Sequence, residues 1–279
     1  MDKKISEIVI PVTQQWENLN ISNDYIFGKV MQNEELCTEL IRRILPDIEI
    51  GRIEFPERQK SIAEGIDVRS VRLDIHTRSE FGPVLDIEMQ MLDTGNLPKR
   101  TRGYHTVLDM SAMNKDLMKS YNDLPTTFVI FICATFDPFN KGRHIYTFQN
   151  ICTEDTNIKL NDGAYTIFLT PKGTADDVSP ELKAFLDFVA GKSSDDPFIK
   201  KLERRILEVK QNSDWRLEYM TLTLRDQENR RLGREEGRTE ERRIMALQMN
   251  REGLPLDMIA RIAKESISVI QSWISEANA

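Results

Sequence analysis

The chain has 279 residues, a mass of 32.3 kDa, a formal net charge of -7 at pH 7 and a pI near 5.3. This acidity excludes a surface that is basic everywhere, so a nucleic-acid site would have to be a local patch. With 40% hydrophobic residues and only 13 glycines and 11 prolines, collagen-like and low-complexity classes are excluded too. The chain is long enough for one large domain, or for a core of about 150 to 200 residues with an appendage.

The cysteines and the apolar segments bear on the compartment. Cys37, Cys133 and Cys152 are far apart and lack the pairwise spacing of a metal site, so we expect reduced thiols. Residues 5–12 are interrupted by a charge and a proline and do not form the apolar core of a signal peptide. The most apolar run, residues 128–134, is far shorter than the ~20 residues of a membrane-spanning helix. We expect a cytoplasmic protein with no membrane partner.

The first third of the chain predicts helix and then sheet. Between Asn20 and Pro46, cap residues precede apolar residues at helical intervals, which predicts a first helical region. Residues 48–55 fit a short edge strand. Residues 71–77 and 85–91 alternate apolar and polar side chains around a turn, which predicts a β-hairpin.

The middle of the chain continues in the same mixed pattern. Residues 97–121 resume helical spacing, and residues 126–136 form a continuous apolar run suited to a central buried strand. Residues 165–170 predict another strand. From Ser179, which can cap a helix with Pro180 at its first position, the chain reads as helical to its end.

The charge divides the chain into parts of different character. Residues 200–251 contain 14 Lys and Arg against 10 Asp and Glu, so the acidity belongs mainly to the rest of the chain. Most of residues 225–243 are charged, with both signs interleaved, which favours a solvated or oligomerising helix over a nucleic-acid arm. We predict a core at 1–178, a helical extension at 179–224, a charged helix or linker at 225–252 and a small helix-turn-helix-like module at 253–279.

The hairpin is the most informative place for chemistry. Its alternation puts one set of polar side chains on one face, namely Arg72, Asp74, His76, Asp86, Glu88 and Gln90. If Thr77 lies opposite Leu85, then Asp74 lies opposite Glu88 with Cβ atoms ~4.5 to 5.5 Å apart. Two facing carboxylates are destabilising unless a proton or a divalent cation neutralises them, and hard oxygen ligands suit Mg²⁺ or Mn²⁺.

The same alternation has a plainer explanation. Acidic side chains are common on a solvent-facing strand surface, and the pattern alone would make this face an ordinary polar one. We expect Asp86 to be such a surface residue. His76 could touch a substrate, but a lone histidine is more often a structural polar group.

The two strands resemble a known motif. Val71-Arg-Leu-Asp-Ile75 and Leu85-Asp-Ile-Glu-Met-Gln90 are similar to the D…ExK core of the PD-(D/E)XK nuclease superfamily. The similarity is greatest to its branch of recombination-promoting nucleases and transposases, in which ExQ replaces ExK. Further similar segments follow in the same order over residues 20 to 275. The resemblance implies an α/β fold with a restriction-endonuclease-like mixed sheet flanked by helices, and an α-helical C-terminal tail.

The resemblance also implies roles for individual residues. Asp74 and Glu88 would ligate the catalytic Mg²⁺ or Mn²⁺, with help from the carbonyl of Met89. Gln90 would stand where lysine usually stands and could orient a water through its amide, but it carries no charge.

Two further residues are candidates for accessory roles at this site. Asp24, in the first helical region, is a candidate for an additional acidic residue by its position in the family pattern. Arg100, at the start of the helix after the hairpin, could hold a phosphate or form a salt bridge.

The function implied is a metal-dependent DNA endonuclease, bacterial, that promotes recombination or is associated with mobile elements. A homodimer formed through the helical tail would suit the cutting of two strands. The alternative is a catalytically degenerate DNA-binding or oligomeric scaffold that keeps the nuclease fold. A third possibility is a nuclease that acts on RNA or in defence, because the motif does not identify the sugar.

The C-terminal end carries a separate signal. Residues 254–263 and 268–274 resemble a helix-turn-helix pair, with Ala260 where the fold needs a small residue. Lys264-Glu265 replaces the usual glycine of the turn, and the second helix, 266–275, has no Lys or Arg. Phosphate contacts usually dominate DNA affinity, so packing or dimerisation is expected first and DNA reading second.

Overall fold

The computed structural model describes residues 12–50, 53–54, 75–79, 82–113 and 120–277. The chain forms two compact units, Met1–Arg216 and Leu217–Ala279, and each is described by itself.

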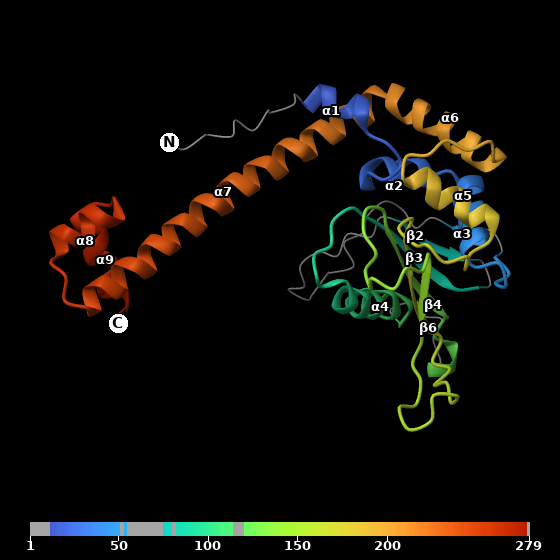
Figure 1. Cartoon of the computed structure of the whole chain (residues 1–279), viewed down its shortest axis with the longest axis horizontal. Helices are drawn as coiled ribbons and strands as arrows, with labels where there is room; N and C mark the ends of the chain where they lie inside the picture. The colour runs from blue at the N-terminus through green and yellow to red at the C-terminus, as the bar shows by residue number, and fades with distance from the viewer. Residues whose placement is uncertain (1–11, 51–52, 55–74, 80–81, 114–119, 278–279) are drawn as a thin grey trace. The chain divides into compact units, whose positions relative to one another are not determined.

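The first unit is built on a mixed β-sheet (Figure 1). Its described strands lie in the order β1-β2-β3-β4-β6-β5. Their bounds are Ile53–Glu54 for β1, Ile75–Ser79 for β2, Val84–Gln90 for β3, Thr127–Cys133 for β4, Ile145–Phe148 for β5 and Ala164–Leu169 for β6. The three central strands β3, β4 and β6 are parallel, and the outer strands pair with them or with each other in antiparallel fashion.

Helices cover both faces of the sheet (Figure 1). One face is covered by α4 and the other by a group of four helices, α2, α3, α5 and α6. The bounds are Val12–Asn18 for α1, Asp24–Met31 for α2, Glu34–Ile44 for α3, Leu97–Met113 for α4, Pro180–Val189 for α5 and Pro197–Gln211 for α6. A mixed sheet between two helical layers is the predicted fold class.

Capping residues explain where the helices begin. Asn23 accepts a hydrogen bond from the backbone N–H of Ile26 (3.2 Å), and Asn33 accepts one from that of Leu36 (3.0 Å). Because Asn33 caps a new helix, the first predicted helical region is two helices, α2 and α3, rather than one. Ser179 caps α5 with Pro180 in its first turn, as predicted.

The strand predictions are confirmed where the structure describes them. Thr77 pairs with Leu85 in the antiparallel β2–β3 hairpin, which is the predicted register. All seven residues of β4 are buried, as expected for a central strand. The edge strand β1 and the strand β6 are also present, while β5 was not predicted.

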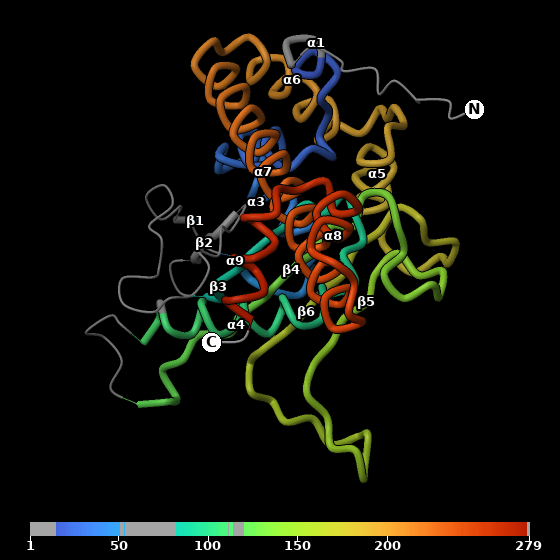
Figure 2. Tube along the Cα trace, turned by 90° about the vertical axis from the view of Figure 1, so that its left-hand side faces the viewer, coloured from blue at the N-terminus to red at the C-terminus, as the bar shows by residue number. Residues whose placement is uncertain are grey.

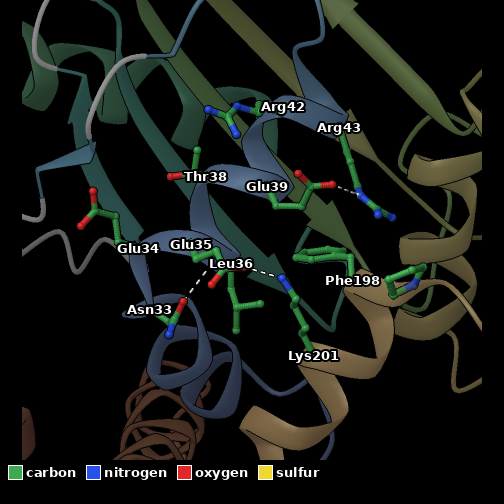
Figure 3. Close-up of a pocket in the computed structure, with 11 residues that line it drawn as sticks. Asn33, Glu34, Glu35, Leu36, Thr38, Glu39, Arg42, Arg43, Phe198 and Lys201 are labelled. Carbon is green, nitrogen blue, oxygen red and sulfur yellow. Dashed lines mark hydrogen bonds and ion pairs between the residues drawn. The ribbon is translucent and has the colours of Figure 1, made fainter.

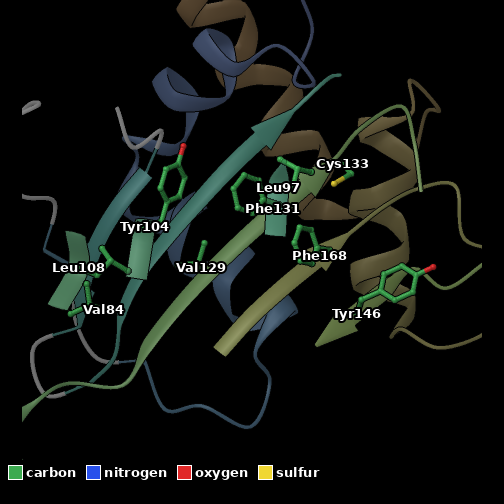
Figure 4. Close-up of a cluster of buried hydrophobic side chains, with 9 residues drawn as sticks. All are labelled: Val84, Leu97, Tyr104, Leu108, Val129, Phe131, Cys133, Tyr146 and Phe168. Carbon is green, nitrogen blue, oxygen red and sulfur yellow. The ribbon is translucent and has the colours of Figure 1, made fainter. Parts of the chain in front are cut away.

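The face under α4 contains a row of aromatic rings (Figure 4). Tyr104 of α4 stacks on Phe131 of β4 with 5.7 Å between ring centroids, and Phe131 stacks on Phe168 of β6 at 5.6 Å. Phe131 is fully buried. The rings therefore connect the helix to the centre of the sheet.

A long loop between β5 and β6 extends away from the sheet (Figures 1 and 2). An isolated antiparallel bridge joins Ile151 to Lys159 within it. Ile158 and Leu160 are exposed on this loop. The loop also carries Asp162, whose charge acts on His105 of α4.

The second unit consists of most of α7 (Ser213–Arg251) with α8 (Leu256–Ala263) and α9 (Ile267–Ala277). Residues 224–241 of α7 are exposed throughout, which fits the predicted solvated or oligomerising helix. Ala260 is buried at the crossing of α8 and α9, and Lys264 ends α8 in the left-handed conformation (φ 56°) that glycine usually supplies. The predicted helix pair is therefore present, and an ion pair from Arg242 to Glu265 (2.8 Å) joins it to α7.

Across the described ranges, none of the helices combines the length and the apolar character needed to cross a membrane.

Candidate functional site

The polar face of β3 is buried, not solvent-facing. Asp86 is fully buried and Glu88 is only 4% exposed. The prediction that Asp86 is a surface residue is wrong, because β4 lies beside β3 and α4 covers this face of the sheet. Carboxylates are rarely buried unless they are paired, so the groups that contact this face decide what it can do.

Arg100 of α4 reaches this face and connects its polar groups. Its Nη1 donates to Oε1 of Gln90 (2.8 Å), and its Nη2 donates to the hydroxyl of Tyr104 (2.7 Å). The same Nη2 lies 3.4 Å from Oε2 of Glu88, in an ion pair. Of the two roles considered for Arg100, the salt bridge is therefore present, and it is made inside the candidate site.

Tyr104 lies one helical turn after Arg100 and faces the same strand. Its hydroxyl accepts from Arg100 and donates to Oε2 of Glu88 (3.4 Å). The pKa of Tyr104 is raised to about 12, mainly by burial and in addition by the charge of Glu88, while Arg100 offsets the rise in part. Tyr104 therefore stays protonated at neutral pH and can donate to the carboxylate.

Gln90 is held at both ends of its amide. Its Oε1 accepts from Arg100, and its Nε2 donates to the backbone carbonyl of Leu92 (2.6 Å). Met89, between Glu88 and Gln90, is buried in the strand. The contribution of its carbonyl to a metal site stays a prediction.

Asp74 lies outside the described residues. The hairpin is described up to the Ile75–Ile87 pair, and His76 lies opposite Asp86 in the same register. Asp24 begins α2, is exposed and accepts a hydrogen bond from the N–H of Tyr25 (2.8 Å). Within the described ranges no group of three or more His, Cys, Asp and Glu residues could hold a metal ion.

A second polar contact under α4 was not predicted. His105 bridges two strands, with Nδ1 2.9 Å from Oγ1 of Thr127 on β4 and Nε2 3.1 Å from Oγ1 of Thr166 on β6. Burial lowers the pKa of His105 below its usual 6.5, and the charges of Asp109 and Asp162 offset this in part. The neutral ring is therefore the form that the fold favours.

The His105 bridge predicts a pH-dependent stability. Because its pKa is lower in the folded state, the unfolded chain binds this proton more readily, and stability falls as pH drops below about 6.5. We expect the wild type to lose more unfolding free energy than His105→Gln between about pH 7.5 and about pH 5.5 in urea titrations. Equal losses in the two proteins would contradict this assignment.

A pocket between α3 and α6 contains none of the predicted site residues (Figure 3). On its wall, Arg43 pairs with Glu39 (3.0 Å) and with Asp196 (3.0 Å), and its guanidinium lies over the ring of Phe198 at 4.4 Å. These groups satisfy one another and hold α3 against α6. The pocket therefore gives no support for a second site.

Tyr104 is a polar partner that the sequence did not predict. One signal was available, because Arg100 and Tyr104 are four residues apart and so share one face of a helix. Their contact with Glu88 and Gln90 depends on how α4 crosses the sheet, which no local pattern specifies.

Comparison with protein families matches residues 22–213 to the PD-(D/E)XK nuclease family transposase model. Neither the curated proteins nor the solved structures yield a significant match. The matched segment covers more than half of the chain and includes α2, the hairpin, α4 and the sheet. The chain belongs to the PD-(D/E)XK nuclease family transposases.

Proposed function

We propose that this protein is a metal-dependent DNA endonuclease whose site is formed by Asp74, Glu88 and Gln90. The observation that carries the proposal is the position of Glu88. Its carboxylate is buried in the C-terminal half of a central strand and contacts the guanidinium of Arg100 and the hydroxyl of Tyr104. The nuclease family supplies the reaction class, the hydrolysis of phosphodiester bonds.

The donor set fits a hard divalent cation. Glu88 is a buried carboxylate whose charge is balanced in part by Arg100 at 3.4 Å, and it supplies one hard oxygen ligand. The described register, continued by one residue, would set Asp74 across from Glu88 and add a second carboxylate. With the carbonyl of Met89 these are oxygen ligands, which Mg²⁺ and Mn²⁺ prefer.

A bound Mg²⁺ would polarise the phosphodiester and lower the pKa of an attacking water. The residues of the chain prepare the site for this. Glu88 supplies the anchoring charge, and Tyr104 fixes the rotamer of Glu88 by donating to its Oε2. Asp24 is proposed as an accessory acid on its family position alone.

The proposed biological role also rests on the membership of the family. A nuclease-type function linked to mobile elements follows from the family, and we propose that the cleavage promotes recombination in a bacterial cell. The three cysteines are free thiols, which supports the cytoplasm as the compartment. We also propose that the helical tail assembles homo-oligomers, a dimer being the simplest form.

Nicking of supercoiled plasmid tests the proposal directly. The purified chain is assayed with Mg²⁺, Mn²⁺ or EDTA beside Asp74→Ala, with folding of the variant checked by circular dichroism. We expect cleavage that requires the metal and is lost in the variant. Intact DNA under every metal, with DNA binding retained, would instead support the scaffold alternative. Parallel RNA substrates separate the third possibility.

A further inference from the structure

The candidate site lacks the lysine that its motif usually contains, yet a cation lies against the residue that replaces it. We propose that Arg100 supplies the positive charge that contacts the scissile phosphate, and that Gln90 and Tyr104 are positioning residues for its guanidinium. This inference rests on the proposed function. It assigns Gln90 a different task from the orientation of water expected from the sequence.

The contacts fix the guanidinium from three sides. Gln90 accepts from Nη1 at 2.8 Å and Tyr104 accepts from Nη2 at 2.7 Å. The guanidinium carbon also lies 5.2 Å from the centroid of Phe131 and 5.4 Å from that of Tyr104, which are cation–π distances. Gln90 is itself held by the Leu92 carbonyl, so the acceptor cannot easily turn away.

Part of the guanidinium remains available to a ligand. The side chain of Arg100 is 29% exposed, so it is not sealed inside the protein. A guanidinium has five N–H donors, and those of Nη2 are directed to Tyr104 and Glu88. Within the described part of the chain, the Nε–H and the second Nη1–H have no partner. Arginine with open donors is well suited to phosphate oxygens.

The position of Arg100 is unfavourable for the helix alone. Arg100 lies near the N-terminus of α4. The first turn of this helix has no acidic residue, and its first two turns contain Lys99, Arg100 and Arg102. Cations at a helix N-terminus oppose the helix dipole, which favours anions there. Helix stability therefore does not explain the choice of residue, whereas the buried Glu88 and an anionic substrate are both partners that favour a cation here.

The test distinguishes a positive charge at one defined position from a general effect of positive charge near the site. Arg100→Gln is compared with Arg102→Gln, which removes the same charge two residues away at an exposed position with no side-chain contact in the described ranges. We expect Arg100→Gln to lower kcat by about 100-fold to 1,000-fold, because it removes a charge that faces the transition state. Arg102→Gln should change kcat by less than about threefold. DNA affinity, measured in Ca²⁺ without cleavage, should fall in Arg100→Gln by much less than kcat does, because one phosphate contact among several is lost. In Arg102→Gln the affinity should change by less than about threefold.

A rescue variant makes the test independent of any structural damage. In Gln90→Lys combined with Arg100→Gln, the cation moves from the helix to the strand, where the family motif has it. We expect this double variant to recover at least about tenfold in kcat over Arg100→Gln. Full activity of Arg100→Gln, or a loss that Gln90→Lys does not relieve in a folded protein, would overturn the inference. A wild type that cleaves no DNA with any metal would overturn the proposed function, and the inference with it.

Discussion

Glu88→Gln should lower the rate of metal-dependent DNA cleavage by at least about 1,000-fold. The change keeps the volume of the side chain and an oxygen that can accept from Tyr104, but it removes the charge that would hold the cation. A metal ion contributes several kcal/mol of transition-state stabilisation, and each ~1.4 kcal/mol corresponds to a factor of ten in rate. Plasmid nicking with Mg²⁺ measures the loss.

Two further measurements make this result specific. Asp93→Asn removes an exposed carboxylate just beyond the same strand and should leave the rate within about threefold of the wild type. The affinity for Mn²⁺, measured by calorimetry without DNA, should fall in Glu88→Gln and not in Asp93→Asn. Cleavage by Glu88→Gln at the wild-type rate would remove Glu88 from the site.

Phe131→Ala should destabilise the first unit by about 3 to 5 kcal/mol, the range for a large side chain deleted from a core. Phe131 is fully buried in the central strand and stacks between Tyr104 and Phe168. Its removal leaves a cavity under α4, and the surrounding sheet can close that cavity only in part. Urea denaturation followed by tryptophan fluorescence measures the change in unfolding free energy.

Phe148→Ala is the matched control for this prediction. Phe148 belongs to the same aromatic group, 5.9 Å from Phe168 between centroids, but it is 46% exposed at the edge of the sheet. Its loss should be clearly smaller than that of Phe131, because water already reaches part of the ring. Equal losses would mean that the core does not centre on β4.

Local patterns were enough to predict most of the sheet. The alternation of the hairpin and a turn centred between its strands predict the Thr77–Leu85 register that is observed, and an unbroken apolar run indicates that β4 is central. The strand β5 was not predicted because it has only four residues, which are partly exposed at the edge of the sheet. Four residues are too few for a clear alternation of apolar and polar side chains. Short edge strands carry little pattern of their own.

The candidate site was predictable only in part. Glu88 and Gln90 stand out through the motif, and Arg100 was named without its partners. The alternation of apolar and polar residues does not predict the burial of Asp86. The same alternation occurs in a strand whose polar face meets solvent and in one whose polar face is covered by a helix. The Arg100–Gln90 contact joins a helix to a strand, so it exists only in the assembled fold.

The strand order of the sheet has a consequence for its assembly. β5 precedes β6 in the chain but lies outside it, so β6 must enter between β4 and β5. The hairpin is a local structure, whereas the parallel neighbours β4 and β6 are contributed by later segments of the chain. A ribosome-bound chain that ends before β4 therefore contains Glu88 but lacks the strand that lies beside it in the sheet. The nascent protein can acquire its candidate site only after β4, which ends at Cys133, has been synthesised.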